Sequence, residues 1–102
     1  MVYFIAQEAM SNNKYMVGLN FPLLPITSSN GSLNILAARV MNLSYASYLR
    51  MCRDLYGAEI TGKNHKYCVA YFNNIKDMQP LLDELNRRTM IILKERERNN
   101  EI

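Results

Sequence analysis

The residues best suited to chemistry lie between positions 36 and 57, where basic and hydroxyl side chains recur at helical spacing. On a helix that turns about 100° per residue, Arg50 and Arg53 fall opposite the apolar positions. Tyr45 and Ser47 add hydroxyl groups to the same stretch. Guanidinium and hydroxyl groups donate hydrogen bonds to phosphate oxygens and to the edges of nucleobases. The stretch therefore favours recognition of an anionic polymer.

The charge of the chain is concentrated around this stretch. The 102 residues carry a formal net charge of +3. Residues 1–35 sum to zero, residues 36–76 to +4 and residues 77–102 to −1. The basic excess therefore covers the helical stretch and the segment that follows it, including Arg39, Lys63 and Lys66.

Catalytic and metal-binding patterns find little support in the sequence. The one histidine, His65, falls in a predicted turn with no nucleophile or carboxylate beside it. Cys52 and Cys68 lie in apolar stretches without CxxC spacing, so we expect two buried thiols; the alternative is a disulfide between them. No set of His, Cys, Asp and Glu has the spacing of metal ligands. We expect no enzyme and no cofactor.

The sequence also bears on location. The N-terminal residues lack a basic start and carry Glu8, so they do not read as a signal peptide. No apolar run approaches the ~20 residues that a transmembrane helix needs. We expect a cytoplasmic protein that does not bind membranes.

Short periodic segments predict an α+β domain. Residues 2–7 and 15–20 are rich in β-branched and aromatic residues, which predicts an N-terminal hairpin. Residues 58–61 and 66–72 predict a second hairpin, whose turn contains Gly62 and Asn64. A C-terminal helix is expected from Asp77 as its cap, with Pro80 in the first turn. We expect one domain over residues 1–98 and a frayed polar tail at 99–102.

The helical stretch between the hairpins has a candidate break at residues 42–44. Asn42 can adopt the left-handed conformation that ends a helix, and Ser44 can cap the next one. Gly57 suits the C-terminal end of that second helix. The alternative is one long amphipathic helix whose arginines are simply solvated.

The broken version resembles the helix-turn-helix of phage repressors and many bacterial regulators. The matching residues are Ala37, Val40, Asn42 (usually glycine in that family), Leu43, Ser44, Tyr48 and Met51. The resemblance implies that the helix from Ser44 is the recognition helix, with Tyr45, Ala46, Ser47, Arg50 and Arg53 facing outward. The hairpin that follows is similar to that of the winged variety, with Lys63 and Lys66 at its tip.

DNA binding is the function that these features favour. Arg50, Arg53, Tyr45 and Ser47 would face the major groove of double-stranded DNA, and Arg39, Lys63 and Lys66 would contact phosphates. The size and the motif would suit a small regulator from a bacterium or a phage.

The alternative function is a non-enzymatic protein-interaction module or small inhibitor. It would use the C-terminal helix or a strand edge to dimerise or to bind a partner. A homodimer would form through the seam of Met78, Leu82, Leu85 and Ile92. The same seam would instead be internal if the helix packs on a sheet.

Overall fold

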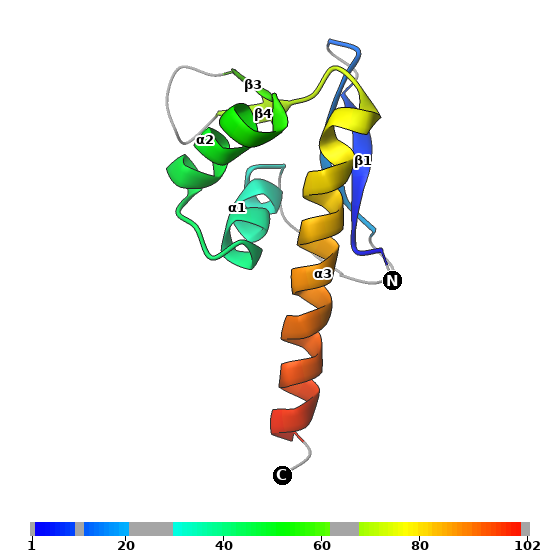
Figure 1. The fold of residues 1–102 in the computed structure, drawn as a ribbon, viewed down its shortest axis with the longest axis vertical. Coiled ribbons are helices and arrows are strands. Elements are labelled where there is room, and N and C mark those ends of the chain that lie inside the picture. Colours follow the sequence, from blue (N-terminus) through cyan, green and yellow to red (C-terminus); the bar gives the residue numbers. More distant parts are fainter. Residues whose placement is uncertain (1, 10–11, 21–29, 62–67, 101–102) are drawn as a thin grey trace.

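The structure is a computed structural model that describes residues 2–9, 12–20, 30–61 and 68–100. Its elements follow in the order β1 (Phe4–Ala9), β2 (Lys14–Leu19), α1 (Asn30–Val40), α2 (Tyr45–Tyr56), β3 (Glu59–Thr61), β4 (Val69–Tyr71) and α3 (Ile75–Asn100). This order confirms the predicted α+β class, with a hairpin, two helices, a second small sheet and a long C-terminal helix (Figure 1).

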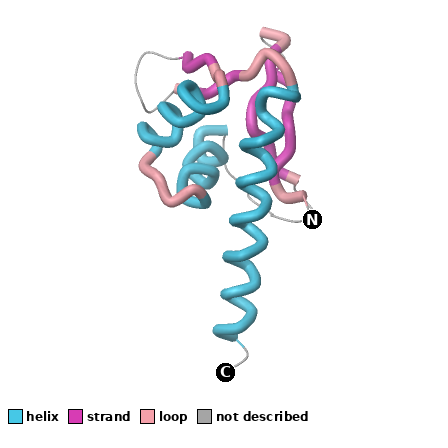
Figure 2. The backbone as a smooth tube through the Cα atoms, in the orientation of Figure 1, coloured by secondary structure: helices cyan, strands magenta, loops and turns pink. Residues whose placement is uncertain are grey.

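The strands form two antiparallel pairs, which one isolated bridge links. β1 pairs with β2 from Phe4 opposite Leu19 to Ala9 opposite Lys14, and β3 pairs with β4. Tyr15 and Phe72 exchange two backbone hydrogen bonds of 2.8 Å each, which connects β2 to the end of β4. Figure 2 shows both hairpins at the same end of the molecule, with α3 extending away from them.

The helical stretch breaks where the sequence predicted. Asn42 has a φ of 59°, and its N–H and that of Leu43 bond back to the carbonyls of Arg39 and Ala38 at 3.0 and 2.9 Å. This pair of bonds is the Schellman motif, which satisfies the last carbonyls of α1. The Ser44 side chain then accepts a hydrogen bond from the Ser47 N–H, and Gly57, with a φ of 72°, ends α2. The alternative of one unbroken helix is wrong.

The long helix α3 supplies one side of the core. Met78, Leu81 and Leu85 are completely buried, because β1, α1 and α2 all pack against this face of the helix. Leu82 is only 4% exposed. The homodimer predicted through Met78, Leu82, Leu85 and Ile92 is therefore wrong in its choice of surface, since three of the four residues lie inside the chain's own core. The alternative, in which the helix packs on a sheet, is the one observed.

The start of α3 also differs from the prediction. The helix begins at Ile75, and the Asp77 N–H donates to the Asn74 carbonyl at 3.2 Å, so Asp77 lies in the first turn and is not the cap. Pro80 lies inside the helix rather than in its first turn. A proline there removes the N–H that would bond to the carbonyl of Lys76, an exposed residue. At the other end, α3 extends to Asn100, into the segment 99–102.

Two polar side chains on opposite flanks of α3 attach the rest of the fold to it. Asn86 faces β1: its Oδ1 accepts from the N–H groups of Tyr3 and Phe4 at 2.7 Å each, and its Nδ2 donates to the Phe4 carbonyl at 3.1 Å. The carboxamide thus pairs with Phe4 as a neighbouring strand would. Arg88 faces the helix pair and donates to the Met41 carbonyl at 3.3 Å, next to the C-terminal end of α1.

The position of Arg88 is fixed by a carboxylate on its own helix. Its Nε donates to Glu84 at 2.6 Å, and Arg87 donates to the same carboxylate. These two guanidinium groups lower the pKa of Glu84 to about 2, so Glu84 stays ionised at neutral pH. The positive charge of Arg88 at the C-terminal end of α1 also interacts favourably with the negative end of that helix's dipole.

One polar atom in the core lacks a conventional partner. The Tyr48 side chain is completely buried, and its hydroxyl makes no hydrogen bond that meets normal geometry with another described residue. Burial raises the pKa of Tyr48, and the Cys52 thiol one turn further along α2 adds to this rise. A thiol is only a weak hydrogen-bonding partner.

Replacing Asn86 by leucine, which has a similar size, should lower the free energy of unfolding by about 2–3 kcal/mol. The substitution leaves the N–H groups of Tyr3 and Phe4 without their partner, and an unsatisfied buried donor costs about 1–3 kcal/mol. Urea denaturation measures the change. The control Gln79→Ala, at an exposed position on the same helix, should stay within about 0.5 kcal/mol of wild type. An Asn86→Leu protein as stable as its control would contradict this role.

Two tyrosines on α2 should respond in opposite ways to the loss of their hydroxyl. Tyr48→Phe should raise the free energy of unfolding by about 1 kcal/mol, because it removes a buried group without a conventional partner. Tyr45→Phe should lower it by about 1 kcal/mol, because the Tyr45 hydroxyl donates to the Cys68 carbonyl. Thermal and urea denaturation of both variants would check this, and equal losses would show that Tyr48 does have a partner.

Candidate nucleic-acid interface

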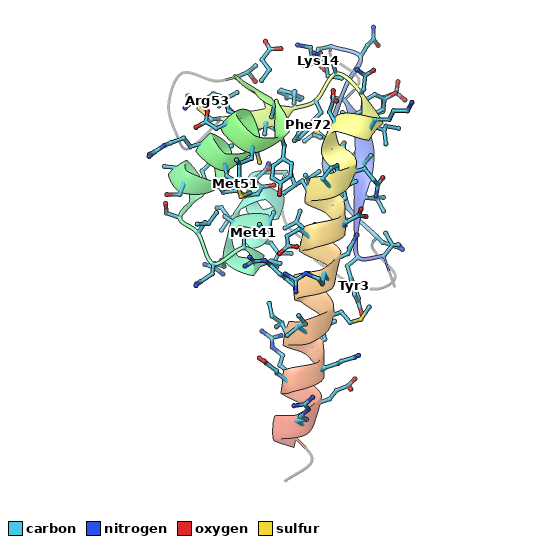
Figure 3. The ribbon with its side chains drawn as sticks, viewed as in Figure 1. Tyr3, Lys14, Met41, Met51, Arg53 and Phe72 are labelled. Carbon is cyan, nitrogen blue, oxygen red and sulfur yellow. The ribbon has the colours of Figure 1, made fainter. Side chains whose placement is uncertain are left out.

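The outward face of α2 carries a short stripe of small and basic residues beside the second hairpin. Ala46, Arg50 and Arg53 follow one another at spacings of four and three residues, so they share one side of the helix. Together with Ile60 and Cys68 they line a shallow cavity of about 130 Å³. The stripe and the hairpin therefore form one continuous surface, and Figure 3 shows Arg53 on the side of α2 that faces this hairpin.

The local structure explains why this face points outward. Tyr48, Leu49 and Cys52 are the buried residues of α2, and they occupy the side of the helix opposite Arg50. Ser44 fixes where the helix starts, because its hydroxyl accepts from the Ser47 N–H at 3.2 Å. Leu43 and Ser44 are exposed, so the N-terminal end of α2 opens to solvent.

Arg53 is paired with Asp54, a residue that is not among the predicted site residues. Asp54 accepts from the Arg53 guanidinium at 2.9 Å, and both side chains are more than half exposed. This hydrogen bond, with a further contribution from Arg50, lowers the pKa of Asp54, so the carboxylate is ionised at neutral pH. The face therefore combines two positive charges with one negative charge. The Arg-Asp dipeptide in the sequence was the available signal for this pair.

Tyr45 was predicted to face outward, but the structure shows that it faces the core. Its ring is half-buried against the core, and its hydroxyl donates to the backbone carbonyl of Cys68. The reason is that the first turn of α2 packs on β4. Burial raises the pKa of Tyr45, and the Cys68 and Cys52 thiols raise it by smaller amounts. Tyr45 thus positions the helix on the hairpin instead of contacting a ligand.

Ser47 is also engaged within the chain. Its hydroxyl accepts a hydrogen bond from the Ser44 hydroxyl at 3.0 Å, and its side chain is half-buried. The two serines form the N-terminal cap of α2. Ser47 therefore has a structural role. Its position in the sequence fits this role as well as it fits the predicted contact with DNA.

Of the three remaining predicted site residues, the structure describes Arg39. Arg39 is exposed but lines a different groove, between α1 and α3, so the structure does not bring it into the stripe of Arg50 and Arg53. Lys63 and Lys66 lie outside the described residues. Of the seven predicted residues, the structure places Arg50 and Arg53 together on the outward face.

The two cysteines are buried and are not joined by a disulfide, as predicted. Burial raises the pKa of Cys52 to about 12, although the nearby Tyr48 hydroxyl opposes this rise. The Cys52 thiol is therefore protonated at neutral pH and a poor nucleophile. Within the described ranges, no three His, Cys, Asp or Glu residues gather in a way that could hold a metal ion.

Among the described residues no helix is long and apolar enough to cross a membrane. The comparisons with known proteins found no match among protein-family models, curated proteins or solved structures.

Proposed function

We propose that the protein binds double-stranded DNA with the outward face of α2 and the neighbouring hairpin. The observation that carries the proposal is the arrangement of two helices joined at Asn42–Ser44, with Arg50 and Arg53 on the exposed side of the second helix. A helix with this placement can enter the major groove, while the adjacent hairpin lies along the backbone.

Arg50 is the residue best suited to contact base edges. It is exposed, and it forms no ion pair with another described residue. Its guanidinium can therefore pair with a guanine through two hydrogen bonds, a contact worth about 1–3 kcal/mol of discrimination. The small side chain of Ala46, one turn before it, leaves room for close approach of the helix to the groove.

Arg53 is better suited to a phosphate. An exposed ion pair such as that with Asp54 contributes little to stability, so the arginine can exchange its carboxylate partner for a phosphate oxygen. The same Asp54 limits the affinity, because its negative charge stays near the DNA backbone. The proposal therefore predicts that removal of the Arg53 charge weakens DNA binding and that removal of the Asp54 charge strengthens it.

A second candidate function is a protein-interaction module. The observation that favours it is the apolar groove of about 410 Å³ between α1 and α3. Such a module would keep its interface at high salt, whereas binding through phosphates weakens steeply as salt is raised.

Removal of both arginines should weaken DNA binding strongly. We expect the wild type to bind a random double-stranded DNA pool at low salt, with an affinity that falls by about 0.9 log units per log unit of salt for each phosphate neutralised. Arg50→Ala/Arg53→Ala should reduce this affinity at least ~tenfold without a change in the far-ultraviolet circular dichroism spectrum. Fluorescence anisotropy measures the binding.

The matched control is Lys94→Ala/Arg98→Ala, which removes the same charge from exposed positions on α3. This variant should bind DNA as the wild type does. If both double variants lose affinity equally, the attraction is non-specific and α2 is not the recognition helix. If the wild type does not bind at low salt, the proposal fails.

Removal of the negative charge at position 54 should have the opposite effect. Asp54→Asn should tighten binding to the same DNA roughly two- to fivefold, because the Asp54 carboxylate and the DNA phosphates repel each other only weakly across water. The gain should shrink as salt is raised. Anisotropy titrations at two salt concentrations test this, and unchanged or weaker binding would place Asp54 away from the DNA.

A further inference from the structure

The groove of about 410 Å³ between α1 and α3 has an apolar interior. Its volume lies within the range of ~300–1,000 Å³ that is typical of sites for small molecules. Its two walls are formed by Leu36 and Val40 of α1 and by Ile92 and Leu93 of α3. Phe4 lies at the bottom, since it lines the groove and is completely buried. The interior therefore favours an apolar ligand over water.

The polar side chain in this interior already has a partner. Thr89 lines the groove and is 5% exposed, and its hydroxyl donates to the Leu85 carbonyl, one turn earlier on α3, at 2.8 Å. This bond satisfies the hydroxyl donor within the helix. The selectivity of the groove for a ligand must therefore come from its rim.

Two arginines lie at the rim, one on each side of the groove. Arg39 belongs to α1 and Arg96 to α3, and both are exposed. Neither forms an ion pair with another described residue, whereas Arg53, Arg87 and Arg88 each have a carboxylate partner. No aspartate or glutamate is among the described residues that line the groove. The rim thus offers two guanidinium groups, each of which can donate two parallel hydrogen bonds to a carboxylate.

An apolar interior and a cationic rim together restrict the kind of ligand. A neutral apolar molecule would leave both arginines without a partner, and an inorganic anion would leave the apolar walls in water. The end of α3 that extends past the other elements does not suit the groove of a second copy, since residues 94–98 are all charged (Figure 1). A molecule with an anionic head and a hydrocarbon tail meets both requirements.

We propose that the groove binds a single-chain amphiphile with a carboxylate head group, of the free fatty acid class. The tail lies between α1 and α3 above Phe4, and the carboxylate accepts hydrogen bonds from Arg39 and Arg96 at the rim. The inference does not rest on DNA binding, because none of the residues that line the groove belongs to the outward face of α2.

Isothermal titration calorimetry of the full chain with decanoate, butyrate and decyltrimethylammonium at neutral pH tests the proposal. We expect decanoate to bind saturably, with one molecule per chain. Butyrate has the same head group but a much shorter tail, and each buried methylene contributes about fourfold to the affinity. Decyltrimethylammonium has a similar tail but a positive head group, which the two arginines repel. Both should therefore bind at least ~tenfold more weakly than decanoate.

Removal of the two rim charges should remove the preference for a carboxylate. Arg39→Gln/Arg96→Gln should lower the affinity for decanoate at least ~tenfold and bring it level with that for decyltrimethylammonium. The matched control is Lys94→Gln/Arg98→Gln, which removes the same charge from exposed positions on α3 that do not line the groove. It should bind decanoate as the wild type does, and circular dichroism should show the same fold for all variants.

Methyl nuclear magnetic resonance spectra locate the ligand. Decanoate should shift the methyl signals of Val40, Ile92 and Leu93, and leave that of Leu55, which is 72% exposed on α2. A wild type that does not bind decanoate, or that binds decyltrimethylammonium equally well, would overturn the proposal. Equal losses of affinity in the two double variants would also overturn it. So would a shift of Leu55 as large as those in the groove, because decanoate would then contact exposed apolar side chains in general.

Discussion

The contact between Asn86 and the first strand is the interaction on which the architecture depends. A strand of six residues with one hairpin partner is marginal by itself, and α3 gives it a second partner through one carboxamide that bonds to Tyr3 and Phe4. On the opposite flank, Arg88 holds the end of α1. Apolar packing between these flanks is non-directional, so the two polar contacts determine how the strands and the helix pair are set against α3.

This arrangement has a direct consequence for the surface of the molecule. Because Tyr48, Leu49 and Cys52 direct α2 toward the core, its remaining side must carry Arg50 and Arg53 outward. Because the Tyr45 hydroxyl donates a hydrogen bond to the Cys68 carbonyl, the second hairpin lies next to the side of α2 that carries Arg50 and Arg53. The basic face of α2 and the groove between α1 and α3 have no lining residue in common, so a substitution in one leaves the other unchanged.

Local patterns predicted the elements well. Asn42, Ser44 and Gly57 act within a few residues of their own positions, which is why the helix break and both caps could be read from the sequence. Side-chain direction was harder, because it depends on partners distant in the chain. Tyr45 is drawn inward by Cys68, and Met78 and Leu85 are covered by three other elements. Asn86 and Arg88 gave no signal at all, since a polar residue on a helix looks the same whether it meets water or a strand.

The Asn86 contact also orders the events of folding. It joins residues that are 82 and 83 positions apart, so it closes a loop of nearly the whole chain. The α1–α2 pair and each hairpin involve only nearby residues, and such local contacts form first because they lose less chain entropy. During synthesis the first strand emerges long before the helix that completes its edge. The edge of β1 therefore stays without this partner until Asn86 and its helix have been made, and an open strand edge is a site of unwanted strand pairing.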